Sequence, residues 1–132
     1  MEPNLSRLNT DSGWVFGISW HPDGTKFATC SDNSIKIWDS NGNQLVYIEN
    51  MPEDWISGIS WHPDGTKFAT CSGDQSIKIW DSDGNKLVHI ENAHPQWING
   101  ISWHPDGTKF ATCCDGIDLL KYGTQTEHNL CI

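Results

Sequence analysis

Apolar and polar residues alternate along the chain in short runs that are separated by turn-forming residues. Alternation with a period of two places successive side chains on opposite faces of the backbone, which is typical of β-strands. The middle of the chain predicts four such strands, at Trp55–Trp61, Lys67–Ser72, Ser76–Asp81 and Lys86–Glu91. No window has the periodicity of a helix, and β-branched and aromatic residues fill the strand positions. The sequence therefore predicts an all-β fold.

Two kinds of turn separate these predicted strands. The first and second strands are joined by His-Pro-Asp-Gly, in which proline fixes φ and glycine supplies a positive φ. The third and fourth are joined by Ser-Asp-Gly-Asn, which is a second turn signal. Short turns of this kind connect neighbouring antiparallel strands, so we expect each group of four strands to form one sheet.

A segment of fourteen residues, Gly-Ile-Ser-Trp-His-Pro-Asp-Gly-Thr-Lys-Phe-Ala-Thr-Cys, occurs three times without a change, at residues 17–30, 58–71 and 100–113. The tryptophans that precede the copies are spaced by 41 and 42 residues, a period that belongs to stacked supersecondary units. The chain is predicted to divide into an N-terminal strand and lead-in at 1–13, repeats at 14–54 and 55–96, a partial repeat at 97–114 and a divergent tail at 115–132.

The repeats resemble the WD-repeat (tryptophan-aspartate repeat) β-propeller family. Trp-Asp pairs at 38–39 and 80–81 end the predicted third strands, where the naming dipeptide of the family lies, and His-Pro-Asp-Gly stands in place of the family's Ser-Pro-Asp-Gly. His94 matches the histidine of the family's Gly-His pair, although Ala93 replaces the glycine. The resemblance covers about residues 5–114 and implies propeller blades, each a four-stranded antiparallel sheet.

The resemblance also implies structural roles for individual residues. One tryptophan of each repeat ends the first strand at a core position, a second tryptophan belongs to the Trp-Asp pair, and an aspartate holds the turn after the second strand. The residues expected to be structural are Trp20, Asp32, Trp38, Asp39, Trp61, Asp74, Trp80, Asp81, His94 and Trp103.

The positions at which the repeats differ indicate a candidate recognition surface. They lie two residues after each repeated tryptophan and in the loops before it, and the resemblance places both near the channel mouth, on a face that docks peptides in the family. Tryptophan is also enriched among the anchors of protein interfaces. The candidate protein-binding residues are Trp14, Phe16, Trp55, Ser57, Trp97 and Asn99. The alternative, that the tryptophans only pack against neighbouring blades, stays open.

The number of repeats is too small for a closed ring. Propellers typically have 4 to 8 blades, whereas this chain has two complete repeats and part of a third. We expect an incomplete ring with open sheet edges, which favour pairing with another copy or with further blades of a longer parent protein. Leu5–Thr10 aligns with Leu45–Asn50 and is expected to be a strand of the fourth type.

The tail resembles nothing upstream of it. With one permitted choice of codons for residues 118–132, reading two bases later gives a segment that matches Ser76–His89 at all but two positions. This match suggests the hypothesis that a frameshift between Cys113 and Asp118 truncated a longer propeller gene. The alternative is a true divergent tail that forms a poor third strand through Ile117, Leu119 and Lys121.

The charge of the chain limits the partners that we expect. Its 8 basic and 17 acidic residues give a formal net charge of −9, which repels nucleic acid phosphates and anionic membranes. No apolar run approaches the ~20 residues of a membrane span, and the first residues lack the basic and apolar regions of a signal peptide. We therefore expect a cytoplasmic protein that binds neither nucleic acid nor membrane.

We interpret the remaining cysteines and histidines as structural residues rather than as catalytic or metal-binding ones. Three of the five cysteines, at 30, 71 and 113, share one repeat position and are expected to be core thiols. His21, His62 and His104 end strands in different repeats, so we interpret them as turn residues and predict no metal site. No unique catalytic constellation is visible, and no cofactor is expected. The sequence predicts a non-catalytic protein-interaction scaffold; a nonfunctional or self-assembling fragment, and an enzyme, are the alternatives.

Overall fold

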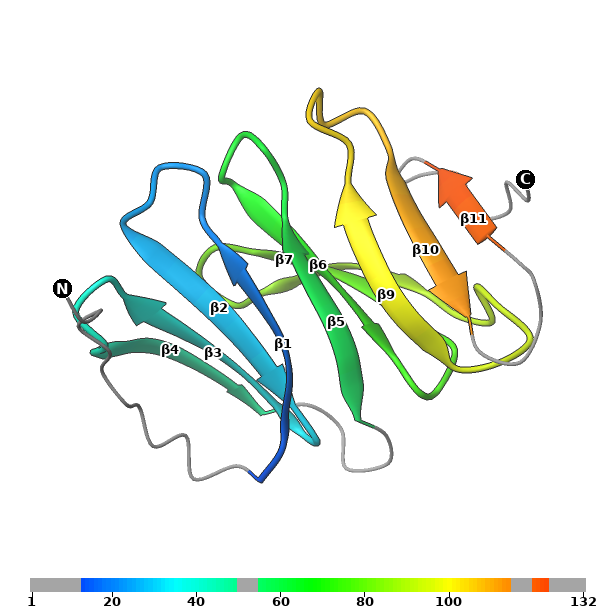
Figure 1. The fold of residues 1–132 in the computed structure, drawn as a ribbon, viewed down its shortest axis with the longest axis horizontal. Helices are drawn as coiled ribbons and strands as arrows, with labels where there is room; N and C mark the ends of the chain where they lie inside the picture. The colour runs from blue at the N-terminus through cyan, green and yellow to red at the C-terminus, as the bar shows by residue number, and fades with distance from the viewer. Residues whose placement is uncertain (1–12, 50–54, 115–119, 124–132) are drawn as a thin grey trace, which may run out of the picture.

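Three antiparallel sheets make up the regular structure of the residues that the structure describes (Figure 1). The computed structural model describes residues 13–49, 55–114 and 120–123. Sheet 1 has the order β1 (Val15–Trp20), β2 (Lys26–Ser31), β3 (Ser34–Asp39) and β4 (Gln44–Glu49). Sheet 2 repeats it with β5 (Ile56–Trp61), β6 (Lys67–Ser72), β7 (Ile77–Asp81) and β8 (Lys86–Ile90). Sheet 3 contains β9 (Ile98–Trp103), β10 (Phe110–Cys114) and β11 (Leu120–Gly123).

The predicted all-β class and the four-stranded antiparallel sheets are confirmed. Each strand of sheet 2 lies within one residue of its predicted bounds, because the alternation of side chains and the two kinds of turn mark the strand ends. In both turn types of this sheet the glycine has a positive φ, 77° at Gly65 and 96° at Gly84, a conformation that glycine adopts without steric cost.

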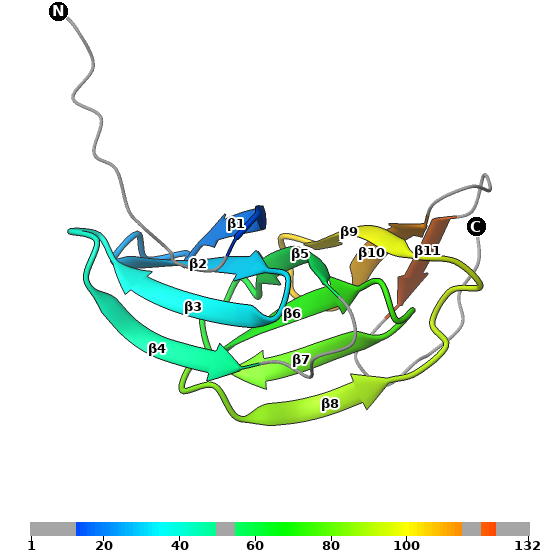
Figure 2. The ribbon, with the colours of Figure 1, turned by 90° about the horizontal axis from the view of Figure 1, so that it is seen from below.

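The three sheets pack side by side in the order of the sequence. Their first strands, β1, β5 and β9, run in the same direction and pack side by side along the inner edge of the arc (Figure 1). The outer strands β4 and β8 lie on the opposite side (Figure 2). The three sheets of the described residues form an open arc and do not close into a ring.

Each pair of neighbouring sheets encloses its own hydrophobic core, and the two cores are built from corresponding residues. Sheet 1 contributes small and aliphatic side chains, and sheet 2 contributes isoleucine and aromatic side chains from the face that meets sheet 1. The first core contains Ala28, Cys30, Ile35, Ile37, Ile59, Trp61, Phe68 and Trp80. The second contains Ala69, Cys71, Ile77, Ile79, Ile98, Trp103 and Phe110. A blade is therefore stable only against its neighbours, as expected for a repeat array.

The tail contributes the third strand of sheet 3. Strand β11 pairs with β10, and Gly123 lies opposite Phe110. In sheets 1 and 2 the corresponding phenylalanines lie opposite Trp38 and Trp80, so sheet 3 has a glycine where the other sheets have an indole. Lys121, which the divergent-tail alternative placed in a strand, lies in β11, whereas Ile117 and Leu119 fall outside the described residues. The expected strand at Leu5–Thr10 falls outside them too, and the frameshift stays a hypothesis about the gene.

Candidate functional site

An edge of the arc carries a set of aromatic side chains, which we call the aromatic rim: Trp14, Phe16, Trp55 and Trp97. Strands β1, β5 and β9 all begin along this edge (Figure 1). Trp14 is 77% exposed and Trp97 is 48% exposed. Phe16 is also exposed, so three of the predicted binding residues are large aromatic side chains that solvent reaches.

The rim residues form two edge-to-face pairs. The ring centroids of Trp14 and Phe16 are 6.2 Å apart, and those of Trp55 and Trp97 are 4.9 Å apart with an interplanar angle of 80°. Trp55 also lies against Gly73 of the β6–β7 turn, where an added Cβ would come within 3.1 Å of the indole. The Gly73 amide donates to the Trp55 carbonyl at 3.0 Å. Trp55 is therefore held in place by sheet 2 and packs edge to face against Trp97.

The two polar candidates of the binding surface have different environments. The Ser57 hydroxyl donates to the carbonyl of Ile98 and lies 3.2 Å from the carbonyl oxygen of Cys71. It thereby links β5 to β9 and is committed to the interface between sheets 2 and 3. Asn99 is exposed, whereas Ser57 is half-buried.

The turn aspartate Asp74 collects donors from its own turn. It accepts from the Ser76 amide at 2.9 Å, from both serine hydroxyls around it, and Lys78 Nζ lies 3.9 Å away. Partial burial raises the pKa of Asp74, but the hydrogen bonds from Ser72 and Ser76 and the charge of Lys78 outweigh this and hold the pKa below its ordinary value. Asp32, at the corresponding turn of sheet 1, is exposed.

The aspartates of the two Trp-Asp pairs organise the turns between third and fourth strands. Asp39 accepts from the amides of Asn41 and Asn43 and from the Asn43 side chain, each at 2.9 Å. Asp81 makes the same three contacts with Asp83 and Asn85. These hydrogen bonds, with those from Asn43 and Asn85 the strongest, lower the pKa of both carboxyls.

Most of the predicted core tryptophans are buried. The indole N–H groups of Trp38 and Trp80 donate to the hydroxyls of Thr29 and Thr70 at 3.0 Å. Trp61 is 5% exposed and Trp103 is 8% exposed, because each packs against a histidine of the preceding sheet.

Trp20 departs from this expectation. The sequence places it in the core with Trp61 and Trp103, yet 54% of it is exposed. The physical reason is that Trp61 and Trp103 are covered by the sheet before their own, and within the described residues no sheet precedes sheet 1. The core assignment is therefore wrong for Trp20 in the single chain.

His94 ties the connection between sheets 2 and 3 to sheet 3. Its side chain is fully buried, and Nε2 lies 2.7 Å from the hydroxyl oxygen of Thr112 on β10. Thr112 corresponds to Thr29 and Thr70, whose hydroxyls accept from an indole. In sheet 3 the threonine hydroxyl is thus hydrogen-bonded to a histidine, whereas in the other two sheets it is hydrogen-bonded to a tryptophan.

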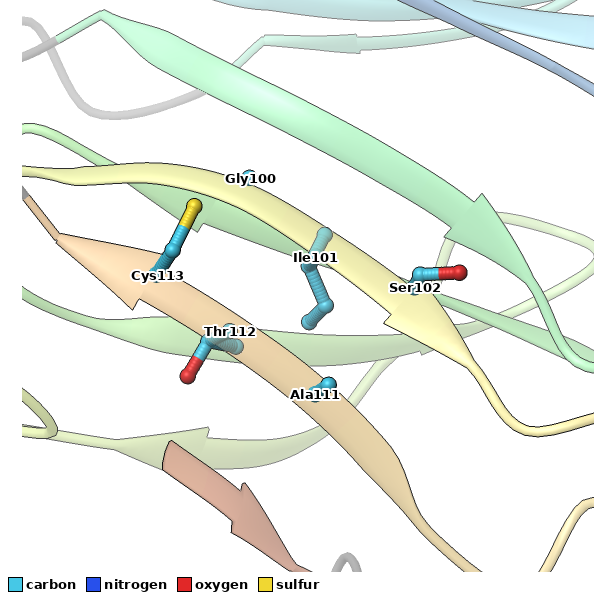
Figure 3. Close-up of a pocket in the computed structure, with 6 residues that line it drawn as sticks. All are labelled: Gly100, Ile101, Ser102, Ala111, Thr112 and Cys113. Carbon is cyan, nitrogen blue, oxygen red and sulfur yellow. The ribbon is translucent and has the colours of Figure 1, made fainter. Parts of the chain in front are cut away.

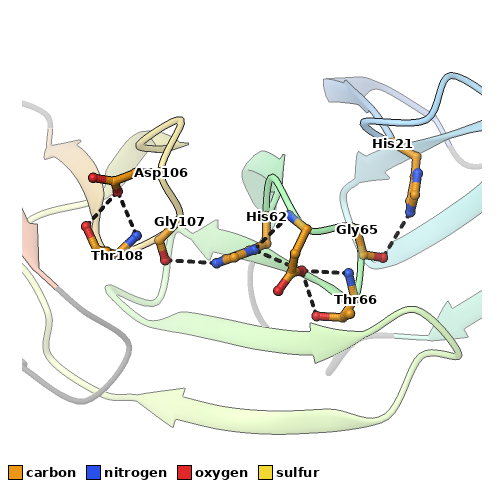
Figure 4. A network of polar contacts seen from close by, with 8 residues as sticks. His21, His62, Gly65, Thr66, Asp106, Gly107 and Thr108 are labelled. Atoms are coloured by element: carbon orange, nitrogen blue, oxygen red, sulfur yellow. Dashed lines mark hydrogen bonds and ion pairs between the residues drawn. The ribbon is translucent and has the colours of Figure 1, made fainter.

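Two further histidines link neighbouring sheets in a way that the sequence did not reveal. His21 Nε2 lies 2.9 Å from the carbonyl oxygen of Gly65, and His62 Nε2 lies 2.8 Å from that of Gly107 (Figure 4). A carbonyl oxygen only accepts, so Nε2 carries the hydrogen and donates. The histidine that replaces the family's serine in His-Pro-Asp-Gly is a sequence signal from which this role could have been found.

The aspartate of each His-Pro-Asp-Gly turn holds the turn closed. Asp106 Oδ1 accepts from the Thr108 hydroxyl at 2.6 Å and from its amide at 2.9 Å (Figure 4). The Thr108 hydroxyl lowers the pKa of Asp106 most, and together with the amide and His104 it brings this pKa to about 2. Asp23 has the same contacts with Thr25, and they lower its pKa as well.

The repeated cysteines are free thiols. Burial is the main reason that the pKa of Cys30 and of Cys71 is raised to about 12, which disfavours the nucleophilic thiolate. The described residues contain no group of three or more histidine, cysteine or acidic side chains placed to hold a metal ion. In the same part of the chain there is no helix long and apolar enough to cross a membrane.

Comparisons with known proteins agree with this architecture. The sequence profile described as "WD domain, G-beta repeat" matches residues 3–39, 43–81 and 85–117, which is well over half of the chain. Over 37 residues, 27% of this chain, the sequence is 43% identical to the probable cytosolic iron-sulfur protein assembly protein Ciao1 of Drosophila mojavensis. That match spans 11% of the length of the relative.

Proposed function

This chain belongs to the WD domain, G-beta repeat family, and we propose that it is a non-catalytic protein-interaction scaffold. In this proposal the aromatic rim binds a protein or peptide after further copies of the chain have completed the ring. The proposal includes a cytoplasmic location, in keeping with the word "cytosolic" in the name of the Drosophila relative. It includes neither nucleic acid nor membranes as partners, because the net charge of −9 opposes both.

The proposal rests on the solvent exposure of the tryptophans in the aromatic rim. Trp14 and Trp97 present large apolar surfaces to solvent directly before β1 and β9, and neither is needed to fill either of the two cores. Tryptophans in such positions contribute strongly to binding because they bury a large area with little loss of side-chain freedom. The acidic chain favours peptides that carry no net negative charge.

Ring closure with other copies is supported by the open ends of the arc. Three sheets are fewer than the 4 to 8 blades of a closed propeller, and each terminal sheet leaves one face without a neighbouring sheet among the described residues. A chain that assembles with itself but has no binding partner is the second candidate, and the same open faces favour it.

Selection from a displayed peptide library tests the binding proposal. We expect the purified chain to select peptides, and Trp97→Ala to weaken the best of them by at least tenfold in fluorescence anisotropy. The matched control is Leu87→Ala, because Leu87 lies on the outer strand β8 and is 55% exposed. The control should bind within twofold of the unchanged chain. Equal losses in both variants, or none in Trp97→Ala, would reject the rim as the binding site.

A further inference from the structure

The interface between neighbouring sheets occurs twice in the chain with the same residues. The Ser19 hydroxyl accepts from the Trp61 amide at 3.1 Å, and the Ser60 hydroxyl accepts from the Trp103 amide at 3.1 Å. The histidine links of His21 to Gly65 and of His62 to Gly107 repeat in the same way. Each interface thus joins the serine and histidine of one sheet to the tryptophan and glycine of the next.

Sheet 3 has the first half of this interface, and no further sheet covers it within the described residues. We call its outer surface the β9 face: Gly100, Ser102, His104, Ala111 and Cys113. The preceding alanines, Ala28 and Ala69, are fully buried, whereas Ala111 is exposed. The side chain of His104 is 45% exposed, compared with 11% for His21 and 10% for His62.

A shallow hollow follows the β9 face. Its volume is about 370 Å³, and strands β9 and β10 line it, with Gly100, Ser102, Ala111 and Cys113 among the lining residues (Figure 3). In sheets 1 and 2 the corresponding surface is covered by the first strand of the next sheet, because β1 packs on β5 and β5 packs on β9. The hollow therefore occupies the place where a further first strand would lie.

The first sheet has the other half of the interface, which we call the β1 face: Ile18, Trp20 and Gly24. Ile18 is 62% exposed, whereas the corresponding Ile59 is 7% exposed. An added Cβ at Gly65 or Gly107 would meet a histidine ring at 2.5 Å, whereas nothing lies within 4 Å of the same position at Gly24. The β1 face is thus exposed at the positions that the preceding sheet covers elsewhere in the chain.

We propose that the β9 face of one copy binds the β1 face of a second copy, head to tail. In this joint Ser102 accepts from the Trp20 amide, His104 Nε2 donates to the Gly24 carbonyl, and Trp20 becomes buried. The fourteen-residue segments on the two sides are identical to those that already pack together inside the chain, so the contacts of the first two strands in the joint repeat contacts that the chain already makes. The inference rests on the oligomeric closure in the proposed function and assigns the residues that produce it.

The number of sheets sets the size of the assembly. Two copies supply about six sheets, which lies within the range of 4 to 8 blades, whereas three copies supply about nine. A head-to-tail contact closes into a ring when its rotation permits and otherwise grows as a filament. The joint therefore predicts a closed dimer with two equal joints and a mass of twice 14.8 kDa.

Two substitutions block the joint from opposite sides. Within the chain an added Cβ at Gly100 meets only the Cys113 sulfur, at 3.4 Å, whereas the same addition at Gly58 lies 3.5 Å from the Gly100 Cα across the interface. Gly100→Val therefore fits its own strand and obstructs a second copy. Ile18→Asp places a charge on the β1 face, where it would be buried without a partner. Leu87→Asp, on the outer strand β8, is the matched control.

Light scattering coupled to size exclusion measures the outcome. We expect dimers for the unchanged chain and for Leu87→Asp, and monomers for Gly100→Val and for Ile18→Asp. An equimolar mixture of these two variants should regain a two-chain complex, because one unaltered β9 face and one unaltered β1 face remain. Circular dichroism checks that each variant keeps its β signal; should Gly100→Val lose it, Ala111→Arg at the exposed β10 position replaces it.

Three results would overturn the joint. If the unchanged chain is a monomer, both the joint and the oligomeric closure fail, while the peptide-binding assay still reports on the rim. If the unchanged chain is a dimer that either folded variant leaves intact, the joint fails and oligomeric closure through another surface stands. The mixture can form one joint without the support of a second; if both variants are monomers and their mixture stays monomeric even at the highest protein concentration, the contact is not head to tail.

Discussion

Trp80 is one of the buried indoles of the core between sheets 1 and 2. Its ring stacks on Phe68 with centroids 6.5 Å apart, and its N–H donates to Thr70 at 3.0 Å. Removal of the indole leaves a cavity in the first core and a buried hydroxyl that loses its donor. We expect Trp80→Ala to lower the free energy of unfolding by about 3–5 kcal/mol, measured by urea denaturation with circular dichroism detection.

The control for this substitution is Trp14→Ala, which removes the same side chain from a position that is 77% exposed. It should change the free energy of unfolding by no more than about 0.5 kcal/mol. Equal destabilisation by the two substitutions would contradict the division of the tryptophans into core and rim.

His62 tests whether the histidine links contribute to stability. Its Nε2 donates to the Gly107 carbonyl at 2.8 Å, and its ring packs on Trp103 with centroids 4.6 Å apart. We expect His62→Ala to cost about 1–3 kcal/mol, since it leaves a carbonyl without its donor and uncovers an indole. His89→Ala, at an exposed position of β8, should be neutral in the same denaturation measurement, and similar losses in both would reject the link.

Residues whose environment depends on their own sheet could be predicted from the sequence, and residues that depend on the next sheet could not. Asp39 and Asp81 bind the turn that follows them, so the structural role predicted for them depends only on a local motif. The exposure of Trp20 and the bond from Ser57 to Ile98 depend on contacts between sheets. A single repeat contains no information about which neighbour is missing.

At the scale of the element, the carboxylate of the His-Pro-Asp-Gly turn makes the stability of the turn depend on pH. The pKa of Asp106 is lowered to about 2 from 3.8, so the folded turn prefers the ionised form. A lowered pKa contributes stability above the unfolded value, and this contribution is lost as the pH falls from about 3.8 through about 2. We expect the turn to loosen in that interval.

Thr108→Val tests the cause of this shift, because it removes the hydroxyl that donates at 2.6 Å and keeps the amide. The pKa of Asp106 should rise toward 3.8 in a carboxyl carbon NMR titration. The corresponding Thr66→Val should leave Asp106 unchanged, since Thr66 bonds to Asp64. An Asp106 titration that Thr108→Val does not alter would show that another group lowers its pKa.

Strand positions were predictable wherever alternation and a turn sequence occurred together, as in all four strands of sheet 2. Strand β11 has neither signal in full. It pairs with β10 through backbone hydrogen bonds, which are available to almost any sequence, and Gly123 takes the position that a tryptophan fills in the complete sheets. Its pairing is explained by the open edge of β10 rather than by its own side chains.

At the scale of the molecule, the period of the repeat was enough to predict blades, and their number was enough to predict an open arc. The surfaces through which the arc could close into a ring were not predictable, because they depend on which faces remain uncovered once the sheets are stacked. The structure shows that these faces are the two halves of one repeated interface, with Trp20 on one side and the hollow beside Ala111 on the other.

The mass of the unchanged chain in solution, measured by light scattering across a range of concentrations, tests the central claim most directly. Head-to-tail closure predicts a single species of twice 14.8 kDa that keeps its mass on dilution into the low micromolar range, because two joints must open together for it to dissociate. A stable monomer of 14.8 kDa with full β signal would contradict the account, since it would show that the exposed faces do not bind each other.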